Sequence, residues 1–301
     1  MVKTGCFSAH FLRFTRNDKM LKSSILVFMT FYALALIVRA VMQPASLPLY
    51  LLMDAGLAGF AFLIVDLTKK RELPADVLAD PFIEMAFAFM VLFALMSIVP
   101  RISLPWWDVG QIINKNIRFV VPVVLMALFF KSSIQEWKIV VHNFWKDALL
   151  GIVVLACLLV PSIFYSGSLK YLASHRLSVA QLAMALGVGF VHSFFGAALP
   201  EELFYRGLIQ RRLSVGLRSP WSGVLLAALF FGIAHSSANA SWGFGKTFFD
   251  GFAEAVLVQS FLGLIFGVLY LRTRNLFLCM GVHAFINAST SIAFFAGKLG
   301  L

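Results

Sequence analysis

Two adjacent glutamates and an arginine lie in an otherwise apolar stretch of the sequence. The segment GAALPEELFYRGLIQRR contains Glu201, Glu202 and Arg206. In an α-helix Arg206 lies one turn from Glu202, so these two side chains can pair, whereas Glu201 points in another direction and is free to act. One fixed carboxylate beside one free carboxylate indicates a general base at Glu201. The simpler interpretation is a helix end at the membrane interface with an ordinary salt bridge.

The residues just before the glutamates carry two further expectations. Pro200 has no N–H group, so the carbonyl of Gly196 is expected to lose its helical partner and to be able to hold a water molecule. His192 precedes Glu201 by nine residues and is therefore expected to face the opposite side of the helix. We interpret His192 as a packing or lipid-interface residue.

Two later motifs place histidines and an asparagine in apolar runs. FFGIAHSS puts Phe231 and His235 one helical turn apart, and GVHAFINAS does the same for His283 and Asn287. Taken alone, His235 is typical of a hydrogen-bonded residue at the end of a membrane helix. The pair His283 and Asn287 alone is typical of a hydrogen-bond clamp between membrane helices.

The expected depths of these side chains in the bilayer are similar. Counted from the expected inner helix ends, Glu201 lies about 16 Å, His235 about 21 Å and His283 about 10 Å into the membrane. An ionisable residue at the centre of a membrane helix costs about 2.5–3.5 kcal/mol on insertion scales. We therefore expect these side chains to meet in the inner half of the bilayer and to line one water-filled cavity.

The composition is that of a membrane protein. Of the 301 residues, 60% are hydrophobic and 13% are charged, whereas a soluble domain is about half apolar and a quarter charged. The net charge is +11. Because the basic residues fall mostly in short gaps between apolar runs, they indicate membrane topology, and we expect contact with the lipid bilayer and none with nucleic acid.

Nine apolar runs have spanning or near-spanning length, so the sequence predicts an all-α polytopic bundle of about nine transmembrane helices. The runs cover residues 23–42, 46–66, 81–99, 117–130, 147–165, 179–201, 221–237, 251–271 and 276–296. The fourth run has only 14 residues. A re-entrant or tilted segment at this place gives eight spans as the alternative. The distribution of Lys and Arg favours a cytoplasmic N-terminus, with the polar cavity in the cytoplasmic half of the bilayer.

The three motifs together resemble those of the CPBP family, the CAAX proteases and bacteriocin-processing enzymes, also called Abi proteins. The family pattern is EExxxR, then FxxxH, then HxxxN or HxxxD on successive membrane helices, and all three occur here in order. The resemblance covers roughly residues 145–301. It implies a helical bundle with a polar intramembrane chamber, and endopeptidase activity on a membrane-associated protein or peptide.

The resemblance also implies a role for each motif residue. Glu201 would activate the attacking water, and His235 would position that water or share its proton. His283 and Asn287 would stabilise the oxyanion, while the salt-bridged pair of the first motif would hold the site together. Peptide hydrolysis needs such a base and such donors.

Zinc is the mechanistic alternative, because Glu201, His235 and His283 would form a familiar catalytic ligand set. The sequence has no HExxH motif, and the asparagine is a poor zinc ligand. We therefore favour hydrolysis by glutamate-activated water without a cofactor, and keep zinc as the alternative.

The linker KSSIQEWKIVVHNFWK is the best internal boundary. It divides residues 1–145, N-terminal membrane helices of unassigned role, from residues 146–301, a protease-like core. Within the N-terminal spans polar residues are few, and Arg39, Asp54 and Glu84 are among them.

Two other function classes fit the sequence less well. A non-catalytic immunity or scaffold protein would keep the fold but would have no need of Glu201. A transporter or proton relay would need polar residues along a path through both leaflets, and the N-terminal spans lack such a path. The sequence does not identify the substrate, and a prenylated CAAX tail is indicated by the resemblance alone.

Overall fold

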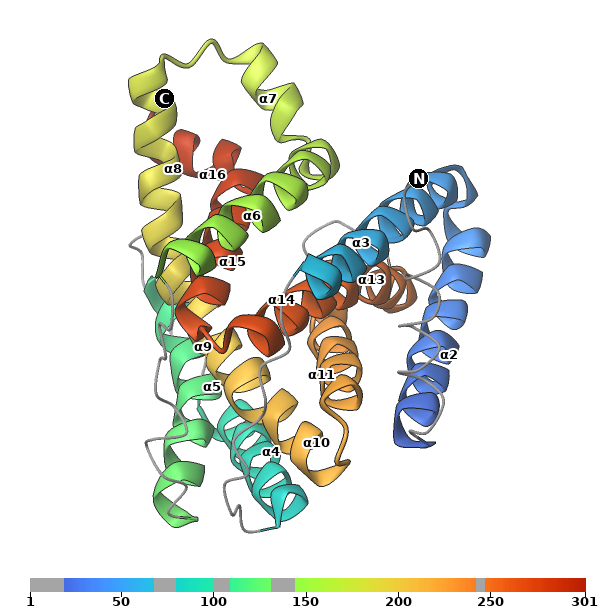
Figure 1. Cartoon of the computed structure of the whole chain (residues 1–301). Coiled ribbons are helices and arrows are strands. Elements are labelled where there is room, and N and C mark those ends of the chain that lie inside the picture. The colour runs from blue at the N-terminus through green and yellow to red at the C-terminus, as the bar shows by residue number, and fades with distance from the viewer. Residues whose placement is uncertain (1–18, 68–79, 100–108, 131–143, 242–246) are drawn as a thin grey trace. The chain divides into compact units, whose positions relative to one another are not determined.

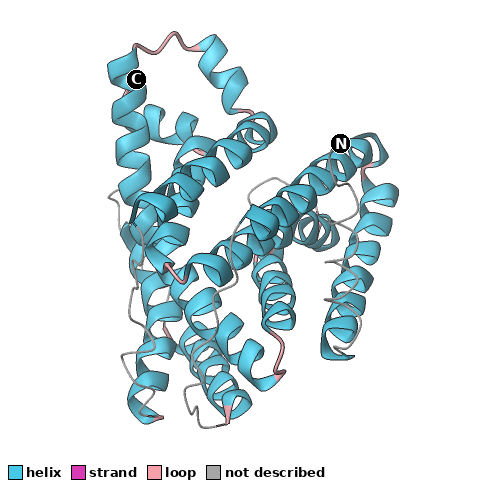
Figure 2. Cartoon of the chain, viewed as in Figure 1, coloured by secondary structure: helices cyan, strands magenta, loops and turns pink. Residues whose placement is uncertain are grey.

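A computed structural model describes residues 19–67, 80–99, 109–130, 144–241 and 247–301. Within these ranges all regular structure is helical and no strand occurs (Figure 2). Seven described helices are long and apolar enough to cross a membrane, and an eighth is added if a helix pair bent by 70° near the C-terminus forms one span. These findings confirm the all-α polytopic fold, whereas the count of nine spans stays a prediction.

The first half of the described chain contains six α-helices and one short 3-10 helix (Figure 1). They are α2 (Lys19–Met42), η1 (Pro44–Ser46), α3 (Leu47–Leu67), α4 (Pro81–Ile98), α5 (Val109–Phe129), α6 (Phe144–Ser166) and α7 (Ser168–Ser174). The run predicted at 117–130 is longer than expected, since α5 has 21 residues. Its first two turns contain polar residues that a search for apolar runs leaves out.

The second half continues with α-helices and three π-helical segments. They are α8 (Val179–Ser193), η3 (Phe194–Ala198), α9 (Leu199–Glu202), η4 (Leu203–Gln210), α10 (Arg211–Gly216), α11 (Pro220–Ala234), α12 (Ser236–Ser241), α13 (Phe248–Glu254), η5 (Ala255–Gln259), α14 (Ser260–Thr273), α15 (Leu276–Thr290) and α16 (Ile292–Lys298). N-terminal capping explains where three of these helices begin. Ser178 forms a capping box with Gln181 at the start of α8. The side chains of Ser219 and Asn275 accept hydrogen bonds from backbone N–H groups in the first turns of α11 and α15.

The chain forms two compact units, which we describe separately. Unit 1 contains residues 1–58 and 209–267, and unit 2 contains residues 59–208 and 268–301. Each unit thus takes residues from both sides of the predicted linker. Most of that linker lies outside the described residues, and the division into 1–145 and 146–301 stays a prediction.

In unit 2, small residues let α15 approach its neighbours closely. A Cβ atom on Gly189 of α8 would lie 2.7 Å from the Phe295 side chain and 3.2 Å from the Cβ of Ala288. On α6, a Cβ atom at Gly151 would lie 2.4 Å from the side chain of Leu278. Close packing of this kind is how membrane helices associate, and it holds α15 next to α8.

In unit 1, α2 packs against helices of the C-terminal half through aromatic and charged side chains. The rings of Phe28 and Tyr32 meet Phe261 with centroids 5.8 Å and 5.4 Å apart. Further along α2, buried Arg39 forms an ion pair with buried Glu254 of α13. The hydroxyl of Tyr50 is hydrogen-bonded to the same carboxylate and lies 3.2 Å from Arg39 Nη2. This buried polar cluster joins α2 to α13.

Candidate active site

The two glutamates lie in a short α-helix between two π-helical segments. Glu201 and Glu202 belong to α9, which has four residues, with η3 before it and η4 after it. In η3 the N–H of Leu199 bonds the carbonyl of Phe194, five residues back. Such wider turns change the direction of the side chains that follow them, and π-bulges occur frequently at functional sites.

The π-helical register before Pro200 brings a second carbonyl into question besides that of Gly196. If the bonds between residues five apart continue past Leu199, the position opposite the Pro200 nitrogen is the carbonyl of Phe195, and the expectation for Gly196 stays a prediction. The side-chain amide of Asn116, on α5, donates to that Phe195 oxygen at 2.8 Å. Asn116 therefore supplies a hydrogen-bond donor of the kind that the proline lacks. This bond links α5 to η3, which leads directly into α9, the glutamate helix.

Glu202 is held by two partners and is fully buried. Arg206 Nε lies 3.1 Å from its Oε2 atom, which confirms the pairing predicted from the i,i+4 spacing. His283 Nδ1 lies 2.8 Å from its other oxygen, Oε1. Because a carboxylate paired with an arginine only accepts hydrogen bonds, His283 Nδ1 carries the proton in this contact. Glu202 therefore links the glutamate helix to α15.

Glu201, which was predicted to be free to act, has a basic partner of its own. Lys115 Nζ, from α5, lies 2.6 Å from its Oε1 atom. His283 Nε2 lies 3.9 Å from its Oε2 atom, which is outside hydrogen-bond distance. The histidine thus stands between the two carboxylates, bonded to one and close to the other.

Asn287 and His235 are the two remaining predicted site residues. Asn287 follows His283 by one turn on α15 and is half-buried, so both are in unit 2. His235 is the C-cap residue of α11, in unit 1. Its Nδ1 atom lies 2.7 Å from the carbonyl oxygen of Phe231, and the two rings pack with centroids 4.7 Å apart. The role of His235 in the site stays a prediction from its motif.

Residues 179–289 match the model of a family described as Type II CAAX prenyl endopeptidase Rce1-like. This segment is similar to the CAAX proteases of that family. The matched segment contains all six predicted site residues, from Glu201 to Asn287. No curated protein and no solved structure matches the chain. The Rce1-like segment covers the motif-bearing helices and leaves out the helices before α8.

Lys115 is the polar residue of the site that sequence reasoning missed, and it lies outside the Rce1-like segment. The predicted span started at 117, so Lys115 was assigned to a connecting segment. The sequence contains a usable signal in the spacing of residues at the start of α5. Ile112, Lys115 and Asn116 are three and four residues apart and share one helix face, which is the face toward the glutamate helix.

In the zinc alternative, the ligands would be Glu201, His235 and His283. Glu201 and His283 belong to unit 2, and His235 belongs to unit 1. Within the described ranges, no group of three or more His, Cys, Asp or Glu side chains is gathered as a metal ion would require. Zinc stays the mechanistic alternative.

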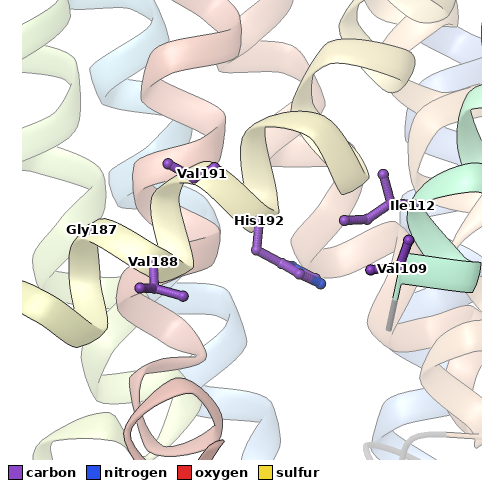
Figure 3. A pocket seen from close by; sticks show the side chains of 6 residues that line it. All are labelled: Val109, Ile112, Gly187, Val188, Val191 and His192. Carbon is purple, nitrogen blue, oxygen red and sulfur yellow. The ribbon is translucent and has the colours of Figure 1, made fainter. Parts of the chain in front are cut away.

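An apolar groove of about 380 Å³ lies between α5 and α8 (Figure 3). Its lining residues are Val109, Ile112, Gly187, Val188, Val191 and His192. His192 points toward α5 and packs against Phe295, with ring centroids 5.3 Å apart, so it is a packing residue as predicted. The expectation that it faces away from Glu201 is wrong, because η3 interrupts the α-helix and both side chains lie against α5.

Proposed function

We propose that this Rce1-like protein is an intramembrane endopeptidase that hydrolyses a peptide bond of a membrane-associated protein or peptide by glutamate-activated water. The observation that supports this proposal most directly is that the two glutamates have different partners. Glu202 is occupied by Arg206 and His283, whereas Glu201 has one oxygen on Lys115 and the other near His283. A carboxylate held by Arg206 and His283 and a second carboxylate beside Lys115 and the same histidine suit different tasks.

In the proposed reaction, Glu201 takes a proton from water while the water oxygen attacks the carbonyl carbon of the substrate. The carbon–nitrogen bond then breaks, and the proton passes from Glu201 to the leaving amine. His235 is assigned the positioning of the water, on the strength of its motif. No step requires a metal ion or other cofactor.

His283 and Asn287 are proposed to stabilise the oxyanion. Since His283 Nδ1 donates to Glu202, its Nε2 atom donates a second hydrogen bond only when the ring is protonated. Asn287, one turn further on α15, supplies a neutral donor. A pair of such donors accounts for a large part of the rate in acyl-transfer enzymes.

The remaining features of the proposal concern the surroundings of the site. The substrate reaches the site from the lipid bilayer, and a prenylated C-terminal tail is the substrate class that the family description suggests. We place the N-terminus on the cytoplasmic side and the site in the cytoplasmic half of the bilayer, because most basic residues then face the cytoplasm.

The test is cleavage of a prenylated peptide by the purified full chain in lipid nanodiscs. Glu201→Gln keeps the shape of the side chain and removes the base, so we expect cleavage to be abolished while the protein stays folded. The matched control is Asp80→Asn, an exposed residue that caps α4 through hydrogen bonds that asparagine also accepts. Asp80→Asn should cleave at the wild-type rate. Full cleavage by Glu201→Gln would end the assignment, and no cleavage by wild type of any prenylated or membrane peptide would favour the non-catalytic scaffold.

A further inference from the structure

The contact between Lys115 and Glu201 joins a partly exposed cation to a buried carboxylate. The side chain of Lys115 is 34% exposed, whereas that of Glu201 is 4% exposed. The ammonium can therefore be reached from outside the buried carboxylate that it pairs with. Lys115 comes from α5, which precedes the Rce1-like segment.

The ammonium occupies one of the two oxygens with which Glu201 can accept a proton. The other oxygen, Oε2, has His283 Nε2 at 3.9 Å. A general base needs its oxygen within hydrogen-bond reach of the water that it deprotonates. While Lys115 is bound to Oε1, the ammonium competes with water for that oxygen, and its release would remove this competition.

The surroundings of Lys115 indicate what could draw it away from Glu201. Ile112 lies one turn before Lys115 on the same face of α5 and lines the apolar groove. An apolar groove with an ammonium one helical turn from a lining residue is complementary to an aliphatic chain with an anionic end. A lysine donates three hydrogen bonds from a flexible four-carbon stem, so its ammonium can change partners without movement of the helix.

We propose that Lys115 is a specificity-determining residue that binds the C-terminal carboxylate of the substrate, and that this exchange of partners releases Glu201. The proposal rests on the proposed endopeptidase function. A CAAX motif is by definition C-terminal, so the substrate class in the family description ends in a carboxylate. The aliphatic residues before that carboxylate suit the groove lined by Val109, Ile112 and Val188. No bond is made or broken in the exchange: one ion pair replaces another.

Binding is measured first, because it does not depend on turnover. The full chain with Glu201→Gln is titrated with a prenylated peptide that has either a free C-terminal carboxylate or a C-terminal carboxamide. We expect about ten- to hundredfold tighter binding of the acid, the usual effect of a hydrogen bond to a charged group. Adding Lys115→Met should bring the two affinities together, Lys115→Arg should keep most of the difference, and Lys170→Met on the exposed face of α7 should leave it unchanged.

Cleavage gives a second readout that a purely structural role of Lys115 would not produce. In the presence of Glu201, Lys115→Met should cleave the acid peptide more slowly than wild type, and the amide peptide faster, because the base is then no longer occupied. Equal affinities for acid and amide in proteins that keep Lys115, or a preference that survives Lys115→Met, would overturn the proposal. Acid-selective binding without any cleavage by wild type would support the carboxylate site and contradict the proposed endopeptidase.

Discussion

His283 Nδ1 lies 2.8 Å from the Oε1 atom of Glu202, so α15 and the glutamate helix share a buried hydrogen bond in unit 2. This contact fixes the histidine ring with its other nitrogen toward Glu201. Glu202, which is not the proposed base, therefore orients His283, which is proposed to stabilise the oxyanion. Glu202 acts as a positioning residue through His283, and this role separates its expected mutational effects from those of Glu201.

The ion pair between Glu202 and Arg206 should show strong coupling. Either Glu202→Ala or Arg206→Ala leaves a buried charge uncompensated, and we expect each to lower the free energy of unfolding by about 3–5 kcal/mol. The double substitution should cost clearly less than the sum, because neither charge is then stranded. Unfolding in mixed micelles, followed by circular dichroism, gives the three values. Simple additivity would show that the 3.1 Å contact is energetically unimportant.

Asn287→Ala distinguishes an oxyanion donor from a residue that orients a zinc ligand. In the metal-free mechanism the substitution removes a donor, and we expect a loss of roughly 10²–10³-fold in rate that added zinc does not restore. In a zinc enzyme the same change would weaken metal binding through His283, and excess zinc would restore turnover. The measurement is the cleavage rate against zinc concentration, after chelation, for wild type and Asn287→Ala. Recovery of both proteins with zinc would make this a metalloprotease.

Two glycines on α8 should respond to alanine in opposite directions. At Gly189 a Cβ atom would lie 2.7 Å from the buried ring of Phe295, so Gly189→Ala should lower the free energy of unfolding by about 1–3 kcal/mol. At Gly187 no atom lies within 4 Å of the added Cβ, and Gly187→Ala should raise it by about 0.5–1 kcal/mol through helix propensity. Thermal unfolding of the two variants side by side tests the packing of α8 against α16. A loss of similar size at both positions would contradict it.

The hydroxyl of Tyr50 should contribute to the attachment of the N-terminal spans in unit 1. Tyr50→Phe removes a hydrogen bond to the charged group of Glu254, and we expect a loss of about 1.5–3 kcal/mol in the free energy of unfolding. Tyr171→Phe is the matched control, because its hydroxyl makes only a 3.4 Å contact with the carbonyl oxygen of Leu301, at the half-exposed end of unit 2. Its effect should stay within about 0.5 kcal/mol. Equal effects of the two substitutions would mean that Tyr50 is a packing residue.

The sequence predicted the helical runs and the pairing within the first motif, because both depend on local spacing. Apolar length identified the regions of the helices, and the four-residue interval between Glu202 and Arg206 was enough to predict their contact. Lys115 was missed because a search for apolar runs ends where polar residues begin, even if those residues face a polar site. The orientation of His192 was wrong because a helical wheel assumes one constant turn, whereas η3 introduces a wider one.

In two ion pairs between helices, the basic residue comes earlier in the chain than the carboxylate that it pairs with. Arg39 precedes Glu254 by 215 residues, and Lys115 precedes Glu201 by 86 residues. A ribosome delivers the chain from its N-terminus, so in both cases the cation enters the membrane long before the carboxylate that neutralises it. During that interval the cation depends on water, lipid phosphate or the insertion machinery for compensation. A nascent chain interrupted before Glu201 would therefore carry two uncompensated basic residues in its inserted helices, and only completed synthesis would neutralise both.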